Sequence, residues 1–145
     1  MVSGVYYREF TKMRDFTGET QLSVVHTHSF ALGMMIMLIV YLFCYTMKIH
    51  TLKNFDVFFY FYNIGVLSTI TLMIIRGTLQ VLEFDLSSGL DSAISGIAGL
   101  GHIAVTIGLV LFFLLLKKII MKIFGRSRQE LFFRSLLRAA ASEKR

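Results

Sequence analysis

Three histidines and one arginine lie in segments of this sequence that are otherwise almost free of charge. His26 and His28 open the stretch VHTHSFALGM, His102 follows a run of small residues, and Arg76 lies near the end of another apolar stretch. Imidazole nitrogens bind haem iron, copper and zinc, and a guanidinium binds carboxylates through paired hydrogen bonds. These four side chains are therefore the first candidates for chemistry in this chain.

The segments that carry these residues are long enough to cross a membrane. Apolar runs cover residues 22–47, 55–82 and 93–116, and the 145-residue chain is 55% hydrophobic with a mean hydropathy of +0.67. About 20 apolar residues span a hydrocarbon core ~30 Å thick, and in lipid the backbone must satisfy its own hydrogen bonds as a helix. The sequence predicts an all-α transmembrane helical bundle with three spans. A soluble bundle would need polar helix faces, which these runs do not offer.

The segments between the runs differ in charge. The loop between the first two runs contains Lys48 and Lys53, and residues 117–145 contain nine Lys or Arg against two Glu. The loop between the second and third runs, residues 83–91, is acidic. Because basic residues stay on the cytoplasmic side, we expect a multi-pass membrane protein with a cytoplasmic C-terminus.

Three segments follow from this pattern. Residues 1–21 form an extracytoplasmic lead-in, residues 22–116 the transmembrane core, and residues 117–145 a basic tail. Residues 2–7 have the character of the end of a transmembrane helix whose first part is missing. A single cysteine, Cys44 in the first run, excludes a disulfide framework.

The basic tail keeps a helical spacing of apolar residues up to residue 138. A basic amphipathic helix of this kind lies against anionic headgroups, each basic residue contributing about 1 kcal/mol. Because the tail is short and follows a span directly, we expect the lipid bilayer as its partner and no nucleic acid. The chain has no proline, so we expect straight helices.

The candidate side chains lie at similar depths. At ~1.5 Å per residue, His28 and Arg76 are on the order of 9 Å below the outer surface and His102 about 15 Å below it. An ionisable group inside a span is a functional hypothesis by default. We therefore expect polar groups from three helices to converge in the outer leaflet.

Small and polar residues share a helical face with these side chains. They are Gly65, Thr69, Arg76, Gln80 and Glu83 on the second run, and Ser95, Gly99, His102 and Thr106 on the third. Small residues at this spacing permit close helix packing. They also leave a slot for a flat cofactor beside His102, with Gly99 in its wall, and the sequence leaves both interpretations open.

Two histidines and an arginine in such a slot indicate a b-type haem. We expect His28 and His102 as axial ligands, with His26 as a substitute or second-site ligand. Arg76, together with Arg8, would hold the propionates. His26 and His28 are about 200° apart on a helix, so both cannot face one partner. The expected role is electron transfer, or redox or gas sensing.

Other interpretations remain. Copper or zinc could be bound by His26, His28 and His102, although the usual carboxylate or thiolate ligand is missing. A cofactor-free bundle would use the same residues for hydrogen bonds between helices. A metal or haem transporter ranks last, because the inner halves of the runs show little of a polar path.

The sequence leaves enzymatic activity uncertain. It contains no Gly-x-Ser-x-Gly motif, no Cys–His pair, no paired carboxylates and no phosphate-binding glycine loop. Any chemistry would therefore be that of a cofactor.

Several motifs resemble a known family. They are GVYYREFTK (4–12), VHTH with LGM (25–28, 32–34), YNIG (62–65), RG with QV (76–77, 80–81) and AISGIAGLGH (93–102). In order and spacing they are similar, over residues 3–116, to small bacterial membrane proteins designated domain of unknown function 2871. The resemblance implies a bacterial cytoplasmic membrane. It also implies four helices, the first ending in GVYYREFTK, so most of that helix is missing here.

A second, more distant resemblance concerns residues 27–30 and Gly33. The sequence THSF followed by this glycine is similar to the haem-ligand helix of haem–copper oxidase catalytic subunits. The resemblance implies that His28 is a ligand of a low-spin haem. Those subunits arrange four-helix arcs with pseudo-threefold symmetry, which implies a homo-oligomer, a dimer or trimer, for a small relative.

Overall fold

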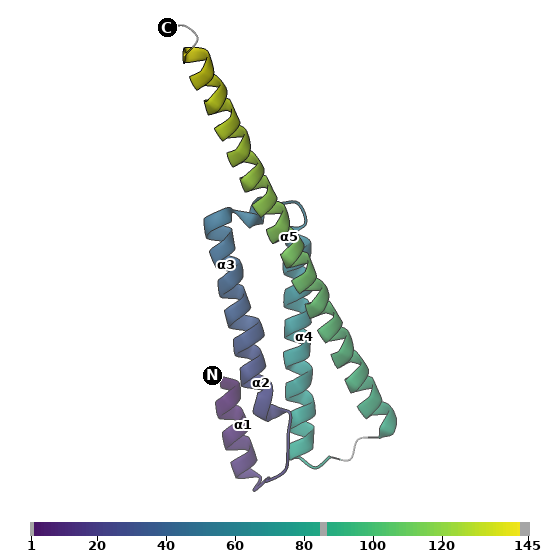
Figure 1. Cartoon of the computed structure of the whole chain (residues 1–145). Helices are drawn as coiled ribbons and strands as arrows, with labels where there is room; N and C mark the ends of the chain where they lie inside the picture. The colour runs from purple at the N-terminus through teal and green to yellow at the C-terminus, as the bar shows by residue number, and fades with distance from the viewer. Residues whose placement is uncertain (1, 85–86, 143–145) are drawn as a thin grey trace.

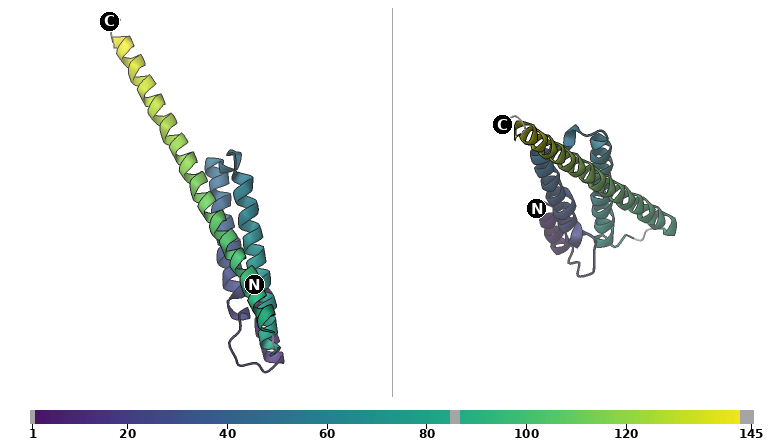
Figure 2. Two further views of the ribbon diagram at one scale, coloured as in Figure 1. Left: turned by 90° about the vertical axis from the view of Figure 1, so that its right-hand side faces the viewer. Right: turned by 45° about the horizontal axis from the view of Figure 1, so that its top comes forward.

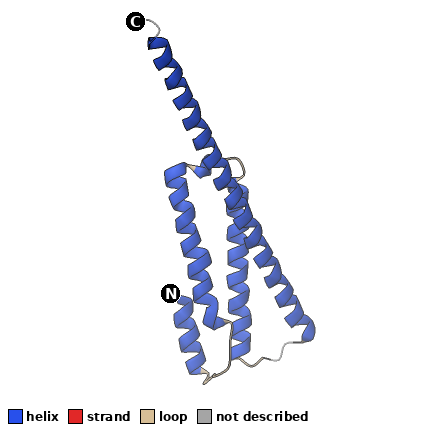
Figure 3. Ribbon diagram, viewed as in Figure 1, coloured by secondary structure: helices blue, strands red, loops and turns tan. Residues whose placement is uncertain are grey.

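The computed structural model describes residues 2–84 and 87–142, and every regular element in these ranges is a helix (Figure 3). The elements are α1 (Val2–Met13), α2 (Leu22–His28), a π-helix η1 (Ser29–Met35), α3 (Ile36–Met47), a 3₁₀ turn η2 (Ile49–Thr51), α4 (Phe55–Val81) and α5 (Ser88–Ser142). Three segments are long and apolar enough to cross a membrane: Leu22–Met47, Phe55–Val81 and Ser88–Phe133. The predicted all-α bundle with three spans is confirmed.

The helix α4 lies at the centre of the bundle (Figures 1 and 2). On one side it packs against the first span, in which α2, η1 and α3 follow one another without a break. On the other side it packs against α5, which crosses it obliquely. The short helix α1 runs beside α2. We call the end where α2 begins, α4 ends and α5 begins the acidic end, after Glu83 and Asp91, and the opposite end the basic end.

Glycines bring α5 close to α4. A Cβ placed on Gly65 would lie only 2.7 Å from the backbone nitrogen of Val105, and one on Gly108 would lie 2.9 Å from Cα of Tyr62. Such contacts let two backbones approach, which is how helices associate in lipid. The core formed there is largely aromatic and aliphatic, with Phe58, Tyr62, Val66, Val105, Phe112, Leu115 and Ile119 buried.

The start of the first span is fastened to α4 by Thr20. Its buried hydroxyl donates to the carbonyl of Gly77 at 2.9 Å and accepts the Leu22 N–H at 3.3 Å. Gly77 has no Cβ, and a Cβ there would lie 2.6 Å from the Leu22 nitrogen. The N-cap residue of α2 is Gln21, and Thr20, one residue earlier, joins the start of this helix to α4.

The first span is not the straight α-helix that the lack of proline predicted. Residues Ser29–Met35 are π-helical, and the Ile36 N–H bonds to Ala31 O, five residues back. The Tyr62 hydroxyl of α4 donates to the carbonyl of Leu32 within this segment at 2.7 Å. Single π turns occur mostly inside α-helices and often at functional sites. This one begins directly after His28.

The third span is longer than predicted. Its helix begins at Ser88, inside the predicted loop, and continues unbroken to Ser142, so the predicted tail helix is the second half of α5. A helix of 55 residues is about 80 Å long, whereas a bilayer with its headgroups is only about 45 Å thick. A large part of α5 therefore lies outside the membrane.

Candidate functional site

The position of His102 along the bundle is given by its neighbour Gly101. A Cβ on Gly101 would lie 2.7 Å from the hydroxyl oxygen of Thr69, so α5 crosses α4 closely at this level. Thr69 is buried, and its hydroxyl has no hydrogen-bond partner among the described residues. The imidazole of His102 itself is exposed beside this crossing.

The position of His28 follows from two contacts of its own span. Leu22 packs against Gly77 of α4, and ten residues later the carbonyl of Leu32 accepts the hydroxyl of Tyr62. His28 lies between these two contacts along its span. It is therefore opposite the middle of the stretch of α4 from Tyr62 to Gly77. This places it at about the same level as the α5 histidine, whereas counting residues along the runs places it level with Arg76.

The two imidazoles are held in the same way. Nδ1 of His28 lies 3.0 Å from the carbonyl oxygen of Val24, and Nδ1 of His102 lies 2.9 Å from that of Ala98, in each case one helical turn earlier. A carbonyl oxygen only accepts, so Nδ1 carries the proton and donates. In the neutral ring Nε2 then has a free lone pair, which is the form in which histidine binds metals.

His26 differs from His28. Its Nε2 contacts the hydroxyl of Thr27 at 3.4 Å, and its Cβ would lie 3.7 Å from a Cβ placed on Gly4. The residue therefore points to the side of α2 on which α1 packs, as its 200° offset from His28 requires.

The histidines lie on helices that flank α4. The helix α5 packs chiefly on α4, whereas α2 packs on both α1 and α4, and α4 lies between α2 and the first half of α5 (Figure 1). Among the described residues, no group of three His, Cys, Asp or Glu side chains is placed to hold a metal ion. The set of His26, His28 and His102 that a copper or zinc site would use is therefore not gathered within one chain.

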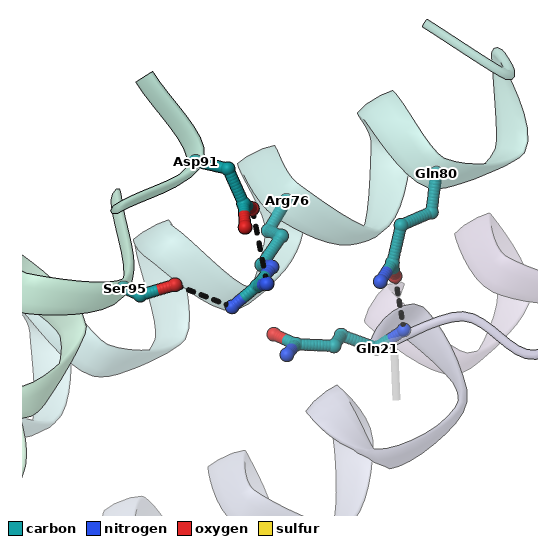
Figure 4. A network of polar contacts seen from close by, with 5 residues as sticks. All are labelled: Gln21, Arg76, Gln80, Asp91 and Ser95. Carbon is teal, nitrogen blue, oxygen red and sulfur yellow. Dashed lines mark hydrogen bonds and ion pairs between the residues drawn. The ribbon is translucent and has the colours of Figure 1, made fainter. Parts of the chain in front are cut away.

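Arg76 is at the centre of a polar network near the acidic end (Figure 4). Its guanidinium donates to the hydroxyl of Ser95 at 2.9 Å and to a carboxylate oxygen of Asp91 at 3.0 Å. Arg76 is seven residues, or about 10 Å, closer to this end than Thr69. The arginine therefore joins α4 to the first turns of α5.

The neighbouring amides join α4 to α2. The backbone N–H of Gln21 donates to the side-chain oxygen of Gln80 at 2.8 Å, and in Figure 4 the side chain of Gln21 extends toward Arg76. All three spans thus meet in polar contacts at the acidic end.

Asp91 is the site residue that the sequence missed, because it was assigned to a loop. The available signal was its spacing: Asp91 and Ser95 are four residues apart, which places them on one face if a helix begins before them. Arg8, predicted to assist Arg76, is exposed on α1 and pairs with its neighbour Glu9 at 3.9 Å. The structure does not bring Arg8 to the network.

Apart from Ser95, which accepts a hydrogen bond from Arg76, the small-polar stripe of the third span does not face α4. Its members Ser95, Gly99, His102 and Thr106 are exposed, and a Cβ on Gly99 would meet nothing within 4 Å. The glycines that pack against α4 lie on the neighbouring face. Close packing therefore explains Gly101 and Gly108, whereas the space beside Gly99 and His102 is open.

Comparison with known proteins places the chain in a family. The model of the family described as "Protein of unknown function (DUF2871)" matches residues 1–119, which confirms the resemblance seen in the motifs. No curated protein and no solved structure matches the chain. The chain is a member of the DUF2871 family.

Proposed function

We propose that this protein binds a b-type haem at the level of Thr69, with His28 and His102 as axial ligands; because α4 separates the two histidines of one chain, the pair would come from neighbouring chains of an assembly. The proposal rests on one observation: the two imidazoles make the same hydrogen bond to their own helix. They lie at one level of α4, and each donates Nδ1–H to its own helix, which leaves Nε2 available. Such second-shell bonds orient metal-bound histidines.

The surroundings fit the chemistry of the group. Gly99, one turn before His102, leaves open space for a flat ring. Arg76 lies nearer to the acidic end, and it already holds a carboxylate of the chain, so the same guanidinium suits a propionate. Bound iron would supply one-electron chemistry or gas binding, and the protein would serve electron transfer or sensing. His26 is the substitute ligand in this proposal.

Location and assembly belong to the same proposal. The basic end and the second half of α5 would face the cytoplasm of a bacterium, and the haem would lie in the outer leaflet. In a single chain His102 is exposed at a depth where polar groups facing lipid are costly. A homo-oligomer, a dimer or trimer, would cover this face.

The absorption spectrum of the purified protein in detergent tests the proposal. We expect a Soret band and the low-spin spectrum of bis-histidine haem. The band should be lost in His28→Ala and His102→Ala and kept in His50→Ala, a matched control in the connection outside the spans. A colourless protein without iron would refute haem binding, and bound copper would favour the three-histidine alternative.

A second candidate is a cofactor-free bundle. It is favoured by the contacts of Arg76 with Asp91 and Ser95, which satisfy the guanidinium without a ligand. In that case the unmodified protein and the histidine variants all lack a haem spectrum. Arg76→Ala still lowers the free energy of unfolding.

A further inference from the structure

We infer that the second half of α5, from Lys117 to Phe133, is a docking helix for an anionic lipid surface. This inference is independent of haem binding. It rests on the exposure and the two-sided character of this part of the helix, and on its charge.

The apolar side chains of this segment are exposed. Phe124 is 72% and Leu131 66% accessible, and Ile120 is also exposed. Figures 1 and 2 show this part of α5 extending from the bundle without another described helix beside it. Large apolar side chains gathered on an exposed surface mark an interaction site.

Three basic side chains of the segment lie opposite these apolar ones, while Lys117 and Arg128 border the apolar face and Phe133 lies among the basic residues. At 100° per residue, Ile120, Phe124 and Leu131 lie on one face. Lys118, Lys122 and Arg126 follow one another at four-residue spacing on the other face, and the centres of the two faces are about 180° apart. This is the distribution of a helix that lies in a membrane interface.

The charge of the segment indicates which surface it binds. Residues 117–145 carry nine Lys or Arg and two Glu, so two copies of this segment repel one another, whereas anionic headgroups attract it. The span to which the segment is joined also keeps it within reach of a bilayer surface, which raises its effective concentration there.

The helix must bend to reach this surface. Phe124 is eight residues, or about 12 Å, beyond residue 116, where the apolar run ends, and this exceeds the thickness of the headgroup layer. Gly125 follows directly, and a Cβ on it would meet nothing within 4 Å. A bend at this glycine would leave Ile120 and Phe124 on the straight part of the helix, so we place the bend before Ile120.

Single labelled cysteines test the inference. In a Cys44→Ser background, which removes the one native cysteine, Leu131→Cys and the matched control Gln129→Cys are labelled with bimane. The full chain is then placed in nanodiscs of phosphatidylcholine, with or without phosphatidylglycerol. We expect a blue shift and quenching by headgroup-level nitroxide lipid only at residue 131 and only with phosphatidylglycerol. About 1 M salt should reverse both effects.

A charge variant and a distance measurement complete the test. Replacing Lys118, Lys122 and Arg126 by Gln keeps the apolar face and should abolish the lipid-dependent shift. Equal spectra in both lipids would overturn the inference. Spin labels at residue 131 are then compared in discs that hold two chains and in discs that hold one. Dipolar broadening only in the discs with two chains would overturn the inference and favour a second copy of the chain as the partner.

Discussion

The guanidinium of Arg76 in α4 lies 3.0 Å from a carboxylate oxygen of Asp91 in the first turn of α5. Arg76 is 27% and Asp91 47% exposed at the side chain, so water screens the pair only in part. Among the described residues it is the ion pair that links two spans. It lies at the acidic end, where α4 ends at Val81 and α5 begins at Ser88.

Removing the carboxylate should loosen this link. Asp91→Asn is expected to lower the free energy of unfolding by about 1 kcal/mol, the size of a partly exposed charged hydrogen bond. Titration with SDS in mixed micelles, followed by circular dichroism, measures it. Asp56→Asn, in the first turn of α4, is the matched control for the loss of a first-turn carboxylate. It should cost less, because Asp56 has no ion pair among the described residues and the change removes its interaction with the helix dipole alone. Equal midpoints for the two variants would contradict a structural role for the pair.

The same pair separates the two candidate functions. If Arg76 holds a propionate, Arg76→Gln should weaken haem binding roughly tenfold or more, the effect of one charge-assisted hydrogen bond. Asp91→Asn removes a competing carboxylate and should not weaken haem binding. Haem titration of the apoprotein measures both affinities. A parallel loss in both variants would show that the arginine acts through helix packing alone.

The axial ligands can be tested by rescue. His28→Gly and His102→Gly remove the imidazole but keep the helix backbone, so millimolar imidazole in the buffer should restore the low-spin spectrum. His26→Gly should keep the spectrum without rescue, because that ring faces α1. If His26→Gly loses the haem and His28→Gly keeps it, the ligand assignment is wrong.

The glycines of α4 and α5 should respond in opposite ways. Gly65→Ala places a methyl group 2.7 Å from a backbone nitrogen of α5 and should cost about 1–3 kcal/mol. Gly99→Ala meets open space and should raise the unfolding midpoint slightly, because alanine favours the helix by about 0.5–1 kcal/mol relative to glycine. Gly99→Leu should keep this midpoint and lower the haem content. If it keeps the haem content, the space beside His102 is not the haem slot.

Tyr62 connects the core to the π-helix. Tyr62→Phe removes the hydrogen bond to Leu32 O and should cost about 1 kcal/mol. Because the π-helix begins directly after His28, the electron paramagnetic resonance spectrum of the haem should also shift. Tyr60→Phe, exposed on the same helix, is the control. If neither variant changes the spectrum, the geometry of the π-helix does not affect the haem ligand.

Hydropathy alone predicted that there are three helical spans and the bounds of the first two. The first span has the predicted bounds, and α4 ends one residue before the predicted end. The reason is physical: a run of about 20 apolar residues in lipid has no option other than a helix. The level of His28 and His102 came instead from contacts with α4, since counting residues predicts the depth of Arg76 for His28 and a greater depth for His102.

The tertiary structure decided which faces meet. The two small-polar stripes differ in place: Gly65 and Thr69 of α4 are buried against α5, whereas the stripe of α5 lies beside this contact. The π-helix accepts a hydrogen bond from Tyr62, 30 residues after Leu32. The partner of Arg76 depends on where α5 begins. Contacts between distant segments set all three features, and a single sequence does not encode them locally.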